Sequence, residues 1–360
     1  MHLAANTGSI DVNSLKDGLQ QHFDANQEIE TVQLAGDASS RKYFRLSQGN
    51  KSYILQWADP FAPETSASHP YISAGQLFQS LGVRTPKILG NIAQKGWVLM
   101  EDLGDKTLSQ EITIDRYKIS IDWIEKMISG VADGLADQSL KKFAGPHLGW
   151  AFDLEKLTFE MRHTATHLVE FYFKENSGKF LTLIENNSVY LAKRPRFFCH
   201  RDYHSRNLML HNDSVYVIDF QDARMGPITY DIVSLLWDPY LDLEESARDS
   251  LLEYWKRKLE SYAISNRPGA ESVQQVFDER VKKVAGWKIE LERMKVQRLL
   301  KAAGSYASFL NLKGRKDYLP WIKPALERSV EALERLKTYK MIEPNEAELL
   351  TLIPHFIKKL

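Results

Sequence analysis

Cysteine is almost absent from this chain of 360 residues, in which Cys199 is the only one. A single cysteine excludes an intramolecular disulfide, and this fits a reducing compartment. An excess of charge is also missing, because 47 basic and 47 acidic residues cancel. A neutral chain has no overall electrostatic footprint for nucleic acid or for an anionic membrane surface, so we expect neither as a partner.

Long apolar runs are missing as well. The first residues, MHLAANTGSIDVNSL, lack the charged and apolar regions of a signal peptide. No stretch reaches the roughly 18 apolar residues that a membrane helix needs. We therefore expect a cytoplasmic protein without a membrane segment, acting as a monomer.

Three common motifs do not occur: G-x-x-x-x-G-K-[ST], G-x-G-x-x-G and G-x-S-x-G. Their absence leaves P-loop, dinucleotide-binding and α/β-hydrolase interpretations without support. Apolar residues, in contrast, make up 43% of the chain and aromatic residues 11%. This composition supports a substantial core, and the length allows two or three domains.

Strand-like runs fill most of the first hundred residues. A helix near Ser14–Phe23 precedes residues 29–58, where three β-rich runs are joined by tight turns. A helix over Tyr71–Leu81 then separates these runs from strands at Pro86–Leu89 and Gly96–Met100. The pattern predicts a five-stranded antiparallel sheet with one inserted helix.

Beyond Gly104 apolar residues recur mainly at helical spacing. Helices are predicted within 115–193 and 230–336, with the short β segments RFFCH, LMLH and VYVIDF between them and a final helix in Met341–Leu360. We therefore predict an α+β, two-lobed protein, with a small β-rich N-lobe (1–104) and a larger, mostly helical C-lobe (105–360).

The segment 199–236 reads CHRDYHSRNLMLHNDSVYVIDFQDARMGPITYDIVSLL. Asp202 ends an H-R-D triplet, Asn207 follows five residues later, and Asp219 comes twelve residues after Asn207. This spacing is typical of phosphotransfer enzymes. An aspartate near a hydroxyl can orient it and accept its proton, which makes Asp202 the candidate base. Carboxylate and amide oxygens suit Mg²⁺, so Asn207 and Asp219 are the candidate metal ligands.

Taken singly, these residues are also common in turns and helix caps, so a purely local role is the alternative. A second pattern concerns the acceptor. Only eleven residues separate Asp219 from Asp231, and no A-P-E element follows. Protein kinases build their peptide platform from a longer segment with that element. A small-molecule acceptor is therefore favoured.

The motif resembles the aminoglycoside phosphotransferase-like superfamily, which is related to protein kinases. With GDASSRKYFRL and MEDLGDKTL upstream, it is more specifically similar to the anomeric N-acetylmuramate and N-acetylglucosamine kinases of bacterial cell-wall recycling. The resemblance implies a protein-kinase-like fold, ATP and Mg²⁺ as cofactors, and a sugar as acceptor.

The resemblance also assigns further roles. A phosphate-covering loop is implied for Gly36, Asp37, Ala38, Ser39, Ser40 and Arg41, although an ordinary hairpin turn is the alternative. Met100, Glu101 and Leu103 would form the hinge that pairs with adenine, or simply end a strand. His200 and Asp231 would support the catalytic loop, and Asp231 could equally be a plain first residue of a helix.

Candidate substrate contacts surround the motif: His204, Arg206, Asp222, Trp237 and Asp238. A sugar site needs aromatic faces for stacking and polar groups for hydroxyls. Loop support is the alternative for His204 and Arg206, and a core aromatic followed by a cap is the alternative for Trp237 and Asp238. A lactyl carboxylate, as in N-acetylmuramate, would also need a cation, for which Arg206 and Arg224 are candidates.

The chain departs from kinases in one respect. A lysine on the third strand usually holds the α- and β-phosphates and pairs with a glutamate on the inserted helix. Here SYILQWA offers Leu55, Gln56 or Trp57, and YISAGQLFQSL has no glutamate. The charge could come from Arg41, Lys42 or Arg45 instead.

Taken together, the sequence predicts an ATP-dependent kinase that phosphorylates a sugar hydroxyl, namely the anomeric hydroxyl of N-acetylmuramate or N-acetylglucosamine in peptidoglycan recycling. The alternatives are a kinase for another small alcohol, such as an aminoglycoside or a choline-like substrate, and a nucleotide-binding pseudokinase.

Overall fold

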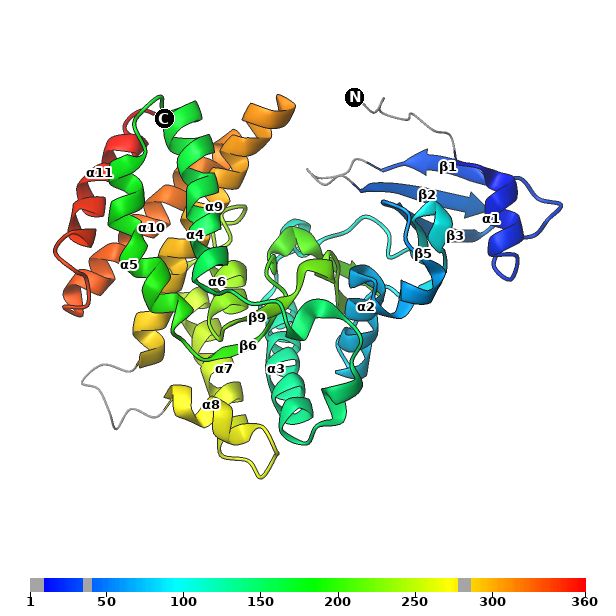
Figure 1. Ribbon diagram of the computed structural model, residues 1–360, viewed down its shortest axis with the longest axis horizontal. Helices are drawn as coiled ribbons and strands as arrows, with labels where there is room; N and C mark the ends of the chain where they lie inside the picture. Colours follow the sequence, from blue (N-terminus) through cyan, green and yellow to red (C-terminus); the bar gives the residue numbers. More distant parts are fainter. Residues whose placement is uncertain (1–9, 35–40, 278–285) are drawn as a thin grey trace.

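The computed structural model describes residues 10–34, 41–277 and 286–360. Figure 1 shows a small lobe built on a sheet and a larger helical lobe beside it. The change from sheet to helices falls just after strand β5 (Trp97–Glu101). This arrangement confirms the predicted α+β, two-lobed fold.

The N-lobe is an antiparallel sheet with strand order β1-β2-β3-β5-β4. Its strands are β1 (Glu30–Gln33), β2 (Lys42–Gln48), β3 (Lys51–Trp57), β4 (Ile88–Ile92) and β5 (Trp97–Glu101). The predicted five strands and their antiparallel order are therefore confirmed. Tight turns allow this order, because neighbouring antiparallel strands need only short connections.

Two helices cover the sheet (Figure 1). Helix α1 (Val12–Gly18) packs on one face, where Leu15 joins Phe44, Leu46 and Leu55 in a separate small core. Helix α2 (Pro70–Ser80) lies between the sheet and the C-lobe, and its Phe78 contacts Phe220 with ring centroids 5.5 Å apart. Helix α2 therefore joins the two lobes through apolar contacts. Gly82, with φ of 70°, follows this helix in the left-handed conformation that favours glycine.

The C-lobe holds the remaining helices of the described chain: α3 (Ile114–Ala136), α4 (Leu154–Thr164), α5 (Gly178–Ala192), α6 (Tyr230–Leu236), α7 (Glu245–Ala263), α8 (Ala270–Phe277), α9 (Gly286–Lys313), α10 (Ile322–Thr338) and α11 (Leu349–Ile357). Helix α4 continues into a π-helical stretch, Ala165–Tyr172. Side-chain caps begin α3 and α4, where Thr113 and Asp153 accept hydrogen bonds from backbone N–H groups.

Two small pairs of antiparallel strands interrupt the helices. Strands β7 (Leu208–His211) and β8 (Ser214–Val217) form one pair, and β6 (Arg196–Cys199) pairs with β9 (Arg224–Pro227) in the other. The sequence predicted β6, β7 and β8 but not β9, whose Arg-Met-Gly-Pro run has little β character. Pairing with β6 compensates for this weak propensity.

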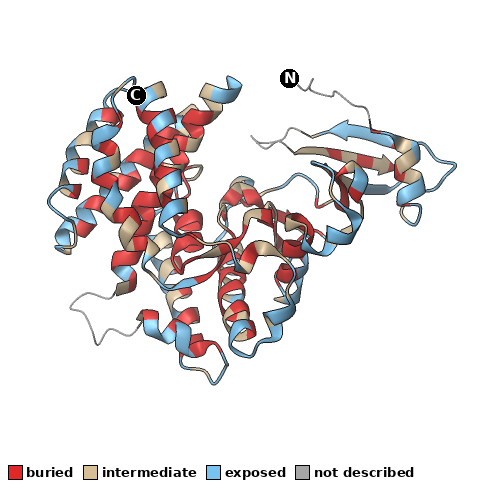
Figure 2. Cartoon of the chain, viewed as in Figure 1, coloured by how far each residue is buried: buried red, intermediate tan, exposed pale blue. Residues whose placement is uncertain are grey.

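Buried residues form a central core, an outer helical core and the small core beneath α1 (Figure 2). Helix α9 contacts α4, α5, α6 and α10 and is buried on nearly all sides. Its buried residues include Glu290, Arg293, Lys295 and Arg298. Charged groups are rarely buried without a partner, so this helix carries polar contacts that its surroundings require.

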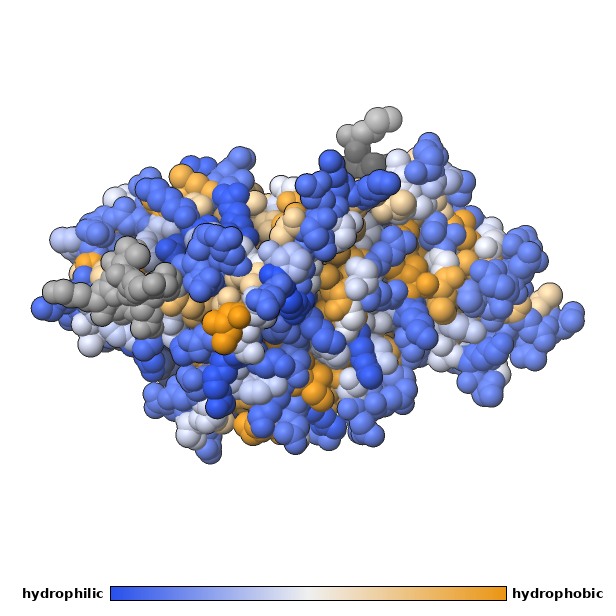
Figure 3. Space-filling view, turned by 90° about the horizontal axis from the view of Figure 1, so that it is seen from below, coloured by the Kyte–Doolittle hydropathy of each residue, from blue (hydrophilic) through white to orange (hydrophobic). Residues whose placement is uncertain are grey.

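The predicted terminal helices are shorter in the structure. The helix expected near Ser14–Phe23 is α1 (Val12–Gly18), and the one expected in Met341–Leu360 is reduced to α11 (Leu349–Ile357) after a 3-10 turn at Glu346–Glu348. Figure 3 shows a face covered mostly by hydrophilic residues, with apolar residues in small groups. Among the described residues, no helix combines the length and the apolar character needed to cross a bilayer.

A buried ion pair fixes the end of the chain. Arg293 of α9 donates from Nη1 and Nη2 to the two carboxylate oxygens of Glu346 at 2.8 and 3.2 Å, and both side chains are at most 6% exposed. Two residues further on, Glu348 pairs with Lys179 at 2.7 Å, with side chains 55% and 61% exposed.

We expect Glu346→Gln to destabilise the protein by about 3–5 kcal/mol, because it leaves a buried guanidinium without its counterion. Glu348→Gln deletes an ion pair that is exposed to water, and this should cost at most about 1 kcal/mol. Urea unfolding monitored by tryptophan fluorescence measures both values. If Glu346→Gln and Glu348→Gln lowered the urea midpoint equally, the buried ion pair would contribute no more to stability than the exposed one, contrary to this prediction.

Candidate active site

The candidate catalytic loop, residues 200–207, lies between β6 and β7 and is held by Asp231 at the start of α6. The Asp231 carboxylate accepts hydrogen bonds from the backbone N–H of His200 at 2.6 Å and of Arg201 at 3.1 Å. Arg201 has a φ of 86°, which is unusual for a residue with a side chain. The two hydrogen bonds stabilise this conformation of Arg201. The conformation turns the chain away from the direction of β6 at Asp202.

The His200 side chain links this loop to the segment before Asp219. Its Nε2 lies 2.9 Å from the carbonyl oxygen of Ile218, just before Asp219. Burial lowers the pKa of His200 to about 4, so the ring is neutral at pH 7. A neutral ring that donates to a carbonyl ties the Asp202 loop to the Asp219 loop. The loop-supporting roles predicted for His200 and Asp231 fit this geometry.

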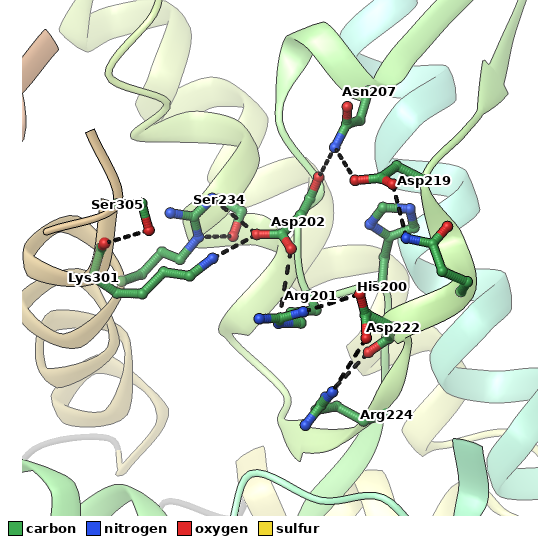
Figure 4. A network of polar contacts seen from close by, with 12 residues as sticks. His200, Arg201, Asp202, Asn207, Asp219, Asp222, Arg224, Ser234, Lys301 and Ser305 are labelled. Atoms are coloured by element: carbon green, nitrogen blue, oxygen red, sulfur yellow. Dashed lines mark hydrogen bonds and ion pairs between the residues drawn. The ribbon is translucent and has the colours of Figure 1, made fainter. Parts of the chain in front are cut away.

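Asp202 is surrounded by cations (Figure 4). Its Oδ1 lies 2.6 Å from Nζ of Lys301 and 3.8 Å from Nη2 of Arg298, and its Oδ2 lies 3.7 Å from Nε of Arg201. Burial alone would raise the pKa of Asp202, but these three charges outweigh it and hold the pKa well below its ordinary value. The carboxylate is therefore ionised and suited to orienting a hydroxyl.

Asn207 and Asp219 converge beside Asp202. The Asn207 amide nitrogen lies 3.0 Å from the carbonyl oxygen of Asp202 and 3.5 Å from Oδ2 of Asp219. This leaves the Asn207 carbonyl oxygen directed away from both (Figure 4). Rotation of the Asn207 amide about its last side-chain bond would turn this oxygen toward Asp219, and the amide oxygen and the carboxylate would then be the hard donors that Mg²⁺ prefers.

Asp219 forms no ion pair with any of the described residues. Burial raises its pKa to about 6, while a hydrogen bond from Gln221, 2.8 Å from Oδ1, acts in the opposite direction. A bound cation would reverse the effect of burial. Among the described residues, no group of three or more His, Cys, Asp and Glu side chains could hold a metal ion. Two protein ligands suffice for Mg²⁺, which usually keeps several waters, so Asn207 and Asp219 fit this ion.

The predicted nucleotide-binding residues fall into two groups. Gly36, Asp37, Ala38, Ser39 and Ser40 lie outside the described residues, and Arg41 is the first described residue of that loop. Its guanidinium lies 4.0 Å from Asp222. Asp222 also lies 3.3 Å from Arg201 and 3.8 Å from Arg224, so this predicted substrate contact is engaged with three arginines that link both lobes.

The predicted hinge residues end β5 and enter the connection to the C-lobe. The sulfur of Met100 accepts a hydrogen bond from the Tyr71 hydroxyl at 3.0 Å, and the carbonyl oxygen of Leu103 lies 3.2 Å from Nδ1 of His211. Between them in the chain, Glu101 donates from its backbone N–H to the carbonyl oxygen of Lys87 at 2.9 Å, and its carboxylate accepts from the Lys87 N–H at 3.2 Å. The position between the lobes is the one expected of a hinge.

Gln56 of β3 is one of the three positions considered for the phosphate-binding lysine. It is 1% exposed and donates from Nε2 to the Tyr43 hydroxyl at 3.1 Å. The charges of Arg41 and Asp219 both act on Tyr43 and on Tyr71 of α2, so both tyrosines lie near the candidate metal ligand Asp219. None of the three β3 positions carries a lysine, and α2 has no glutamate, so the kinase ion pair is absent from these described elements.

The other two cations considered for this role are engaged elsewhere. Arg45 donates to both Asp102, at 2.7 and 3.0 Å, and Asp105, at 2.9 and 3.1 Å. Arg45 therefore links β2 to the segment that follows β5. The Lys42 ammonium lies 5.6 Å from the centroid of the Trp57 ring. Of the three candidates, Arg41 alone lies close to Asp219 and Asp222.

Aromatic side chains gather on the other side of the catalytic loop. His204 and Arg206 both face Tyr240, with a ring centroid distance of 5.4 Å and a guanidinium-to-centroid distance of 4.0 Å. Tyr240 in turn contacts Tyr306 and Trp321. We call this set the acceptor-side cluster: His204, Arg206, Tyr240, Tyr306 and Trp321. Aromatic faces with polar neighbours are typical of sugar sites.

Trp237 and Asp238 are placed differently from the predicted substrate contacts. Trp237 is 4% exposed and lies under the ammonium of Lys295, 3.7 Å from its ring centroid, in the central core. The Asp238 carboxylate accepts from the backbone N–H and the hydroxyl of Ser205 at 2.9 and 2.5 Å. Trp237 thus has the contacts of a core aromatic, the alternative considered from the sequence, whereas Asp238, considered there as a cap, supports the loop at Ser205.

Sequence reasoning missed Lys301, Arg298 and Tyr240 as site residues. The two cations come from α9, about a hundred residues beyond the motif, and no local spacing connects them to Asp202. One available signal was polar side chains within a helix that is otherwise apolar on all sides. Tyr240 follows Asp238 by two residues, and its contacts with His204 and Arg206 depend on the fold.

The chain is similar to known phosphotransfer enzymes. The chain matches the phosphotransferase enzyme family over residues 30–264, and it is 27% identical over 94% of its length to the N-acetylmuramate/N-acetylglucosamine kinase of Neisseria meningitidis, covering 95% of that protein. It is 28% identical over 81% of its length to the kinase of the same name from Pseudomonas aeruginosa, covering 80% of it.

Among solved structures, the choline kinase LicA from Streptococcus pneumoniae superposes with a TM-score of 0.58 at 14% identity, covering 91% of this chain and 99% of that one. An ethanolamine kinase from Plasmodium vivax gives a TM-score of 0.54 at 13% identity, covering 86% and 84%. The fold is therefore kinase-like. The chain itself belongs to the phosphotransferase enzyme family.

We expect Asp231→Asn to loosen the catalytic loop. Its amide nitrogen would face one of the two N–H donors, so a buried donor would lose its partner at a cost of about 1–3 kcal/mol. Hydrogen exchange of the His200 and Arg201 amides should become faster, and the urea midpoint should fall.

Asp153→Asn is the matched control, since Asp153 also accepts a backbone N–H, from Lys156 at 2.8 Å, but at an exposed helix start. Asparagine caps helices nearly as well as aspartate, so little change is expected there. Unchanged exchange in Asp231→Asn would show that the loop is held by other contacts.

Proposed function

We propose that this protein is an ATP-dependent, cytoplasmic sugar kinase that phosphorylates the anomeric hydroxyl of N-acetylmuramate and N-acetylglucosamine. The convergence of Asp202, Asn207 and Asp219 on one short hairpin carries the proposal. The sugar is supported by the two relatives named N-acetylmuramate/N-acetylglucosamine kinase, which align with most of the chain. A monomer satisfies this proposal, since all the groups that it invokes come from one chain.

In the proposed reaction the acceptor hydroxyl donates a hydrogen bond to Asp202, and its oxygen attacks the γ-phosphorus of ATP. The bond from that phosphorus to the β–γ bridging oxygen breaks, ADP leaves, and the hydroxyl proton passes through Asp202 to water. Phosphoryl transfer has a loose transition state that needs little prior deprotonation. A low-pKa carboxylate is therefore adequate, because its main task is orientation.

The residues of the chain divide the remaining tasks. Asn207 and Asp219 would hold Mg²⁺, which when bound would balance charge on the phosphate oxygens. Arg41, just before β2, supplies a cation near the phosphates, and the segment Met100–Leu103 offers backbone groups to the adenine. On the acceptor side, Tyr240 presents an aromatic ring to the sugar and Arg206 a positive charge. Closure of the lobes would exclude water, which otherwise hydrolyses the nucleotide.

The first test is magnesium-dependent ADP release with ATP and a panel of acceptors: N-acetylmuramate, N-acetylglucosamine, glucose, an aminoglycoside and choline. We expect turnover on the N-acetyl sugars, and ³¹P NMR of the product should show an anomeric phosphate. Asp202→Asn should lower kcat by about 10²–10⁴-fold, the range for a general base. Asp249→Asn, an exposed carboxylate on α7, should leave kcat unchanged.

Other outcomes have distinct meanings. Turnover on glucose, the aminoglycoside or choline alone would replace the sugar and keep the mechanism. Nucleotide binding without turnover on any acceptor would overturn the kinase proposal in favour of a pseudokinase.

The two sugars differ by one lactyl group, so they test the role of Arg206. Its guanidinium lies over Tyr240 at the acceptor side, whereas Arg224 is 9% exposed and packs against Trp150 and Phe152. We therefore assign the lactyl carboxylate to Arg206 rather than Arg224.

Arg206→Gln should lower kcat/KM for N-acetylmuramate at least about tenfold more than for N-acetylglucosamine, because a charged hydrogen bond is worth about 1.5–3 kcal/mol. Steady-state kinetics on both sugars measure the ratio directly. An equal loss on both would place the carboxylate elsewhere.

A further inference from the structure

A lysine outside the catalytic motif contacts the candidate base. Lys301 lies on α9, 99 residues beyond Asp202, and donates from Nζ to Oδ1 at 2.6 Å (Figure 4). The two side chains are 13% and 22% exposed, so water screens the contact only partly. The H-R-D-x-x-x-x-N motif contains no lysine that could make this contact.

The same helix fixes this arrangement one turn earlier. Arg298 donates from Nε to the hydroxyl of Ser234 at 3.0 Å and places Nη2 3.8 Å from Oδ1 of Asp202. Helix α9 thus presents two cations to one carboxylate oxygen. The other oxygen, Oδ2, has Arg201 at 3.7 Å, which is beyond hydrogen-bond distance. Oδ2 is therefore the oxygen left to accept an acceptor hydroxyl.

Stability alone does not explain a lysine here. Burial disfavours the charged ammonium and lowers the pKa of Lys301, with the charge of Asp202 acting in the opposite direction. Replacing a buried ion pair with apolar residues is often neutral or stabilising. Leu300, Ala302 and Ala303 next to it are buried and apolar, so a nonpolar side chain would suit this stretch of α9.

A second carboxylate lies behind the cations. Glu160 of α4 is 4% exposed, and neither of its carboxylate oxygens has a hydrogen-bond partner in the part of the chain that the structure describes. Its charge acts on both Lys301 and Arg201. Glu160 therefore offsets the excess positive charge around Asp202. This favours the protonated form of Lys301, whose ammonium still donates to Asp202.

We propose that Lys301 is a positioning residue: it holds Oδ1 of Asp202, so that Oδ2 faces the acceptor hydroxyl in the geometry for in-line transfer. The inference rests on the proposed function, because it assumes that Asp202 orients the acceptor. It adds a residue from α9 to the catalytic apparatus, and it assigns different tasks to the two oxygens of one carboxylate.

Three variants test this inference in the full-length protein with the N-acetyl sugars. Lys301→Met removes the hydrogen bond and should lower kcat about 10²-fold, the order expected when a reacting group is misplaced by about 1 Å. The KM for sugar and the Kd for ATP should stay within about threefold. Lys301→Arg keeps a donor and should recover part of the lost kcat.

Lys295→Met is the matched control. Lys295 is also a buried lysine of α9, 2% exposed and paired with Glu292 at 2.8 Å, but it lies under Trp237 in the core. It should lose stability much as Lys301→Met does while retaining kcat. If both variants lose kcat equally, the effect of Lys301 comes from the helix and the inference is wrong.

A double-mutant cycle separates action through Asp202 from an independent role. In an Asp202→Asn background, Lys301→Met should change the residual kcat by less than about threefold, because groups that act as a unit are not additive. A further drop of about 10²-fold would overturn the inference. Wild-type protein is assayed in the same series: absent turnover there overturns the proposed function and with it the role of Lys301, whereas wild-type turnover with an unaffected Lys301→Met overturns the Lys301 inference alone.

Discussion

Two hydrogen bonds to one buried carboxylate determine where the chemistry of this protein can occur. Asp231 accepts the backbone N–H groups of His200 and Arg201 and so stabilises the left-handed conformation of Arg201. Without that turn the chain would continue along β6, and Asp202 would not reach α9 or the Asp219 loop. A conformation that costs free energy persists only where surrounding contacts determine it, and here those contacts come from the first turn of α6.

The positive charge that kinases concentrate on the N-lobe sheet is distributed differently here. Strand β3 has no lysine at Leu55, Gln56 or Trp57, helix α2 has no glutamate, and Arg41, just before β2, lies 4.0 Å from Asp222. On the C-lobe, α9 contributes Arg298 and Lys301 next to Asp202. Phosphoryl transfer requires cations around the transferring group, but it does not require that they come from one particular strand. The fold can therefore keep the reaction while the source of charge changes.

The parts of the site that could be predicted from sequence are those that depend on local spacing. Asp202, Asn207 and Asp219 converge because a short hairpin connects them, and the five strands follow from alternating apolar residues between turns. Lys301 could not be predicted, since its contact with Asp202 depends on the packing of α9 against the loop. The same holds for Trp237, whose aromatic character suits a sugar or a core equally. Only the fold shows that Lys295 covers its ring.

The charges at the acceptor side argue for a neutral or anionic acceptor. The structural likeness to choline and ethanolamine kinases, at 13–14% identity, shows the fold alone and says nothing about the acceptor. A cationic acceptor would need free carboxylates, yet Asp238 is saturated by Ser205 and Tyr240, and Asp202 faces Lys301 and Arg298. Arg206 adds a further cation over Tyr240. These contacts disfavour an ammonium group beside the base by like-charge repulsion, and an amino sugar whose nitrogen is acetylated, and hence uncharged, is compatible with them.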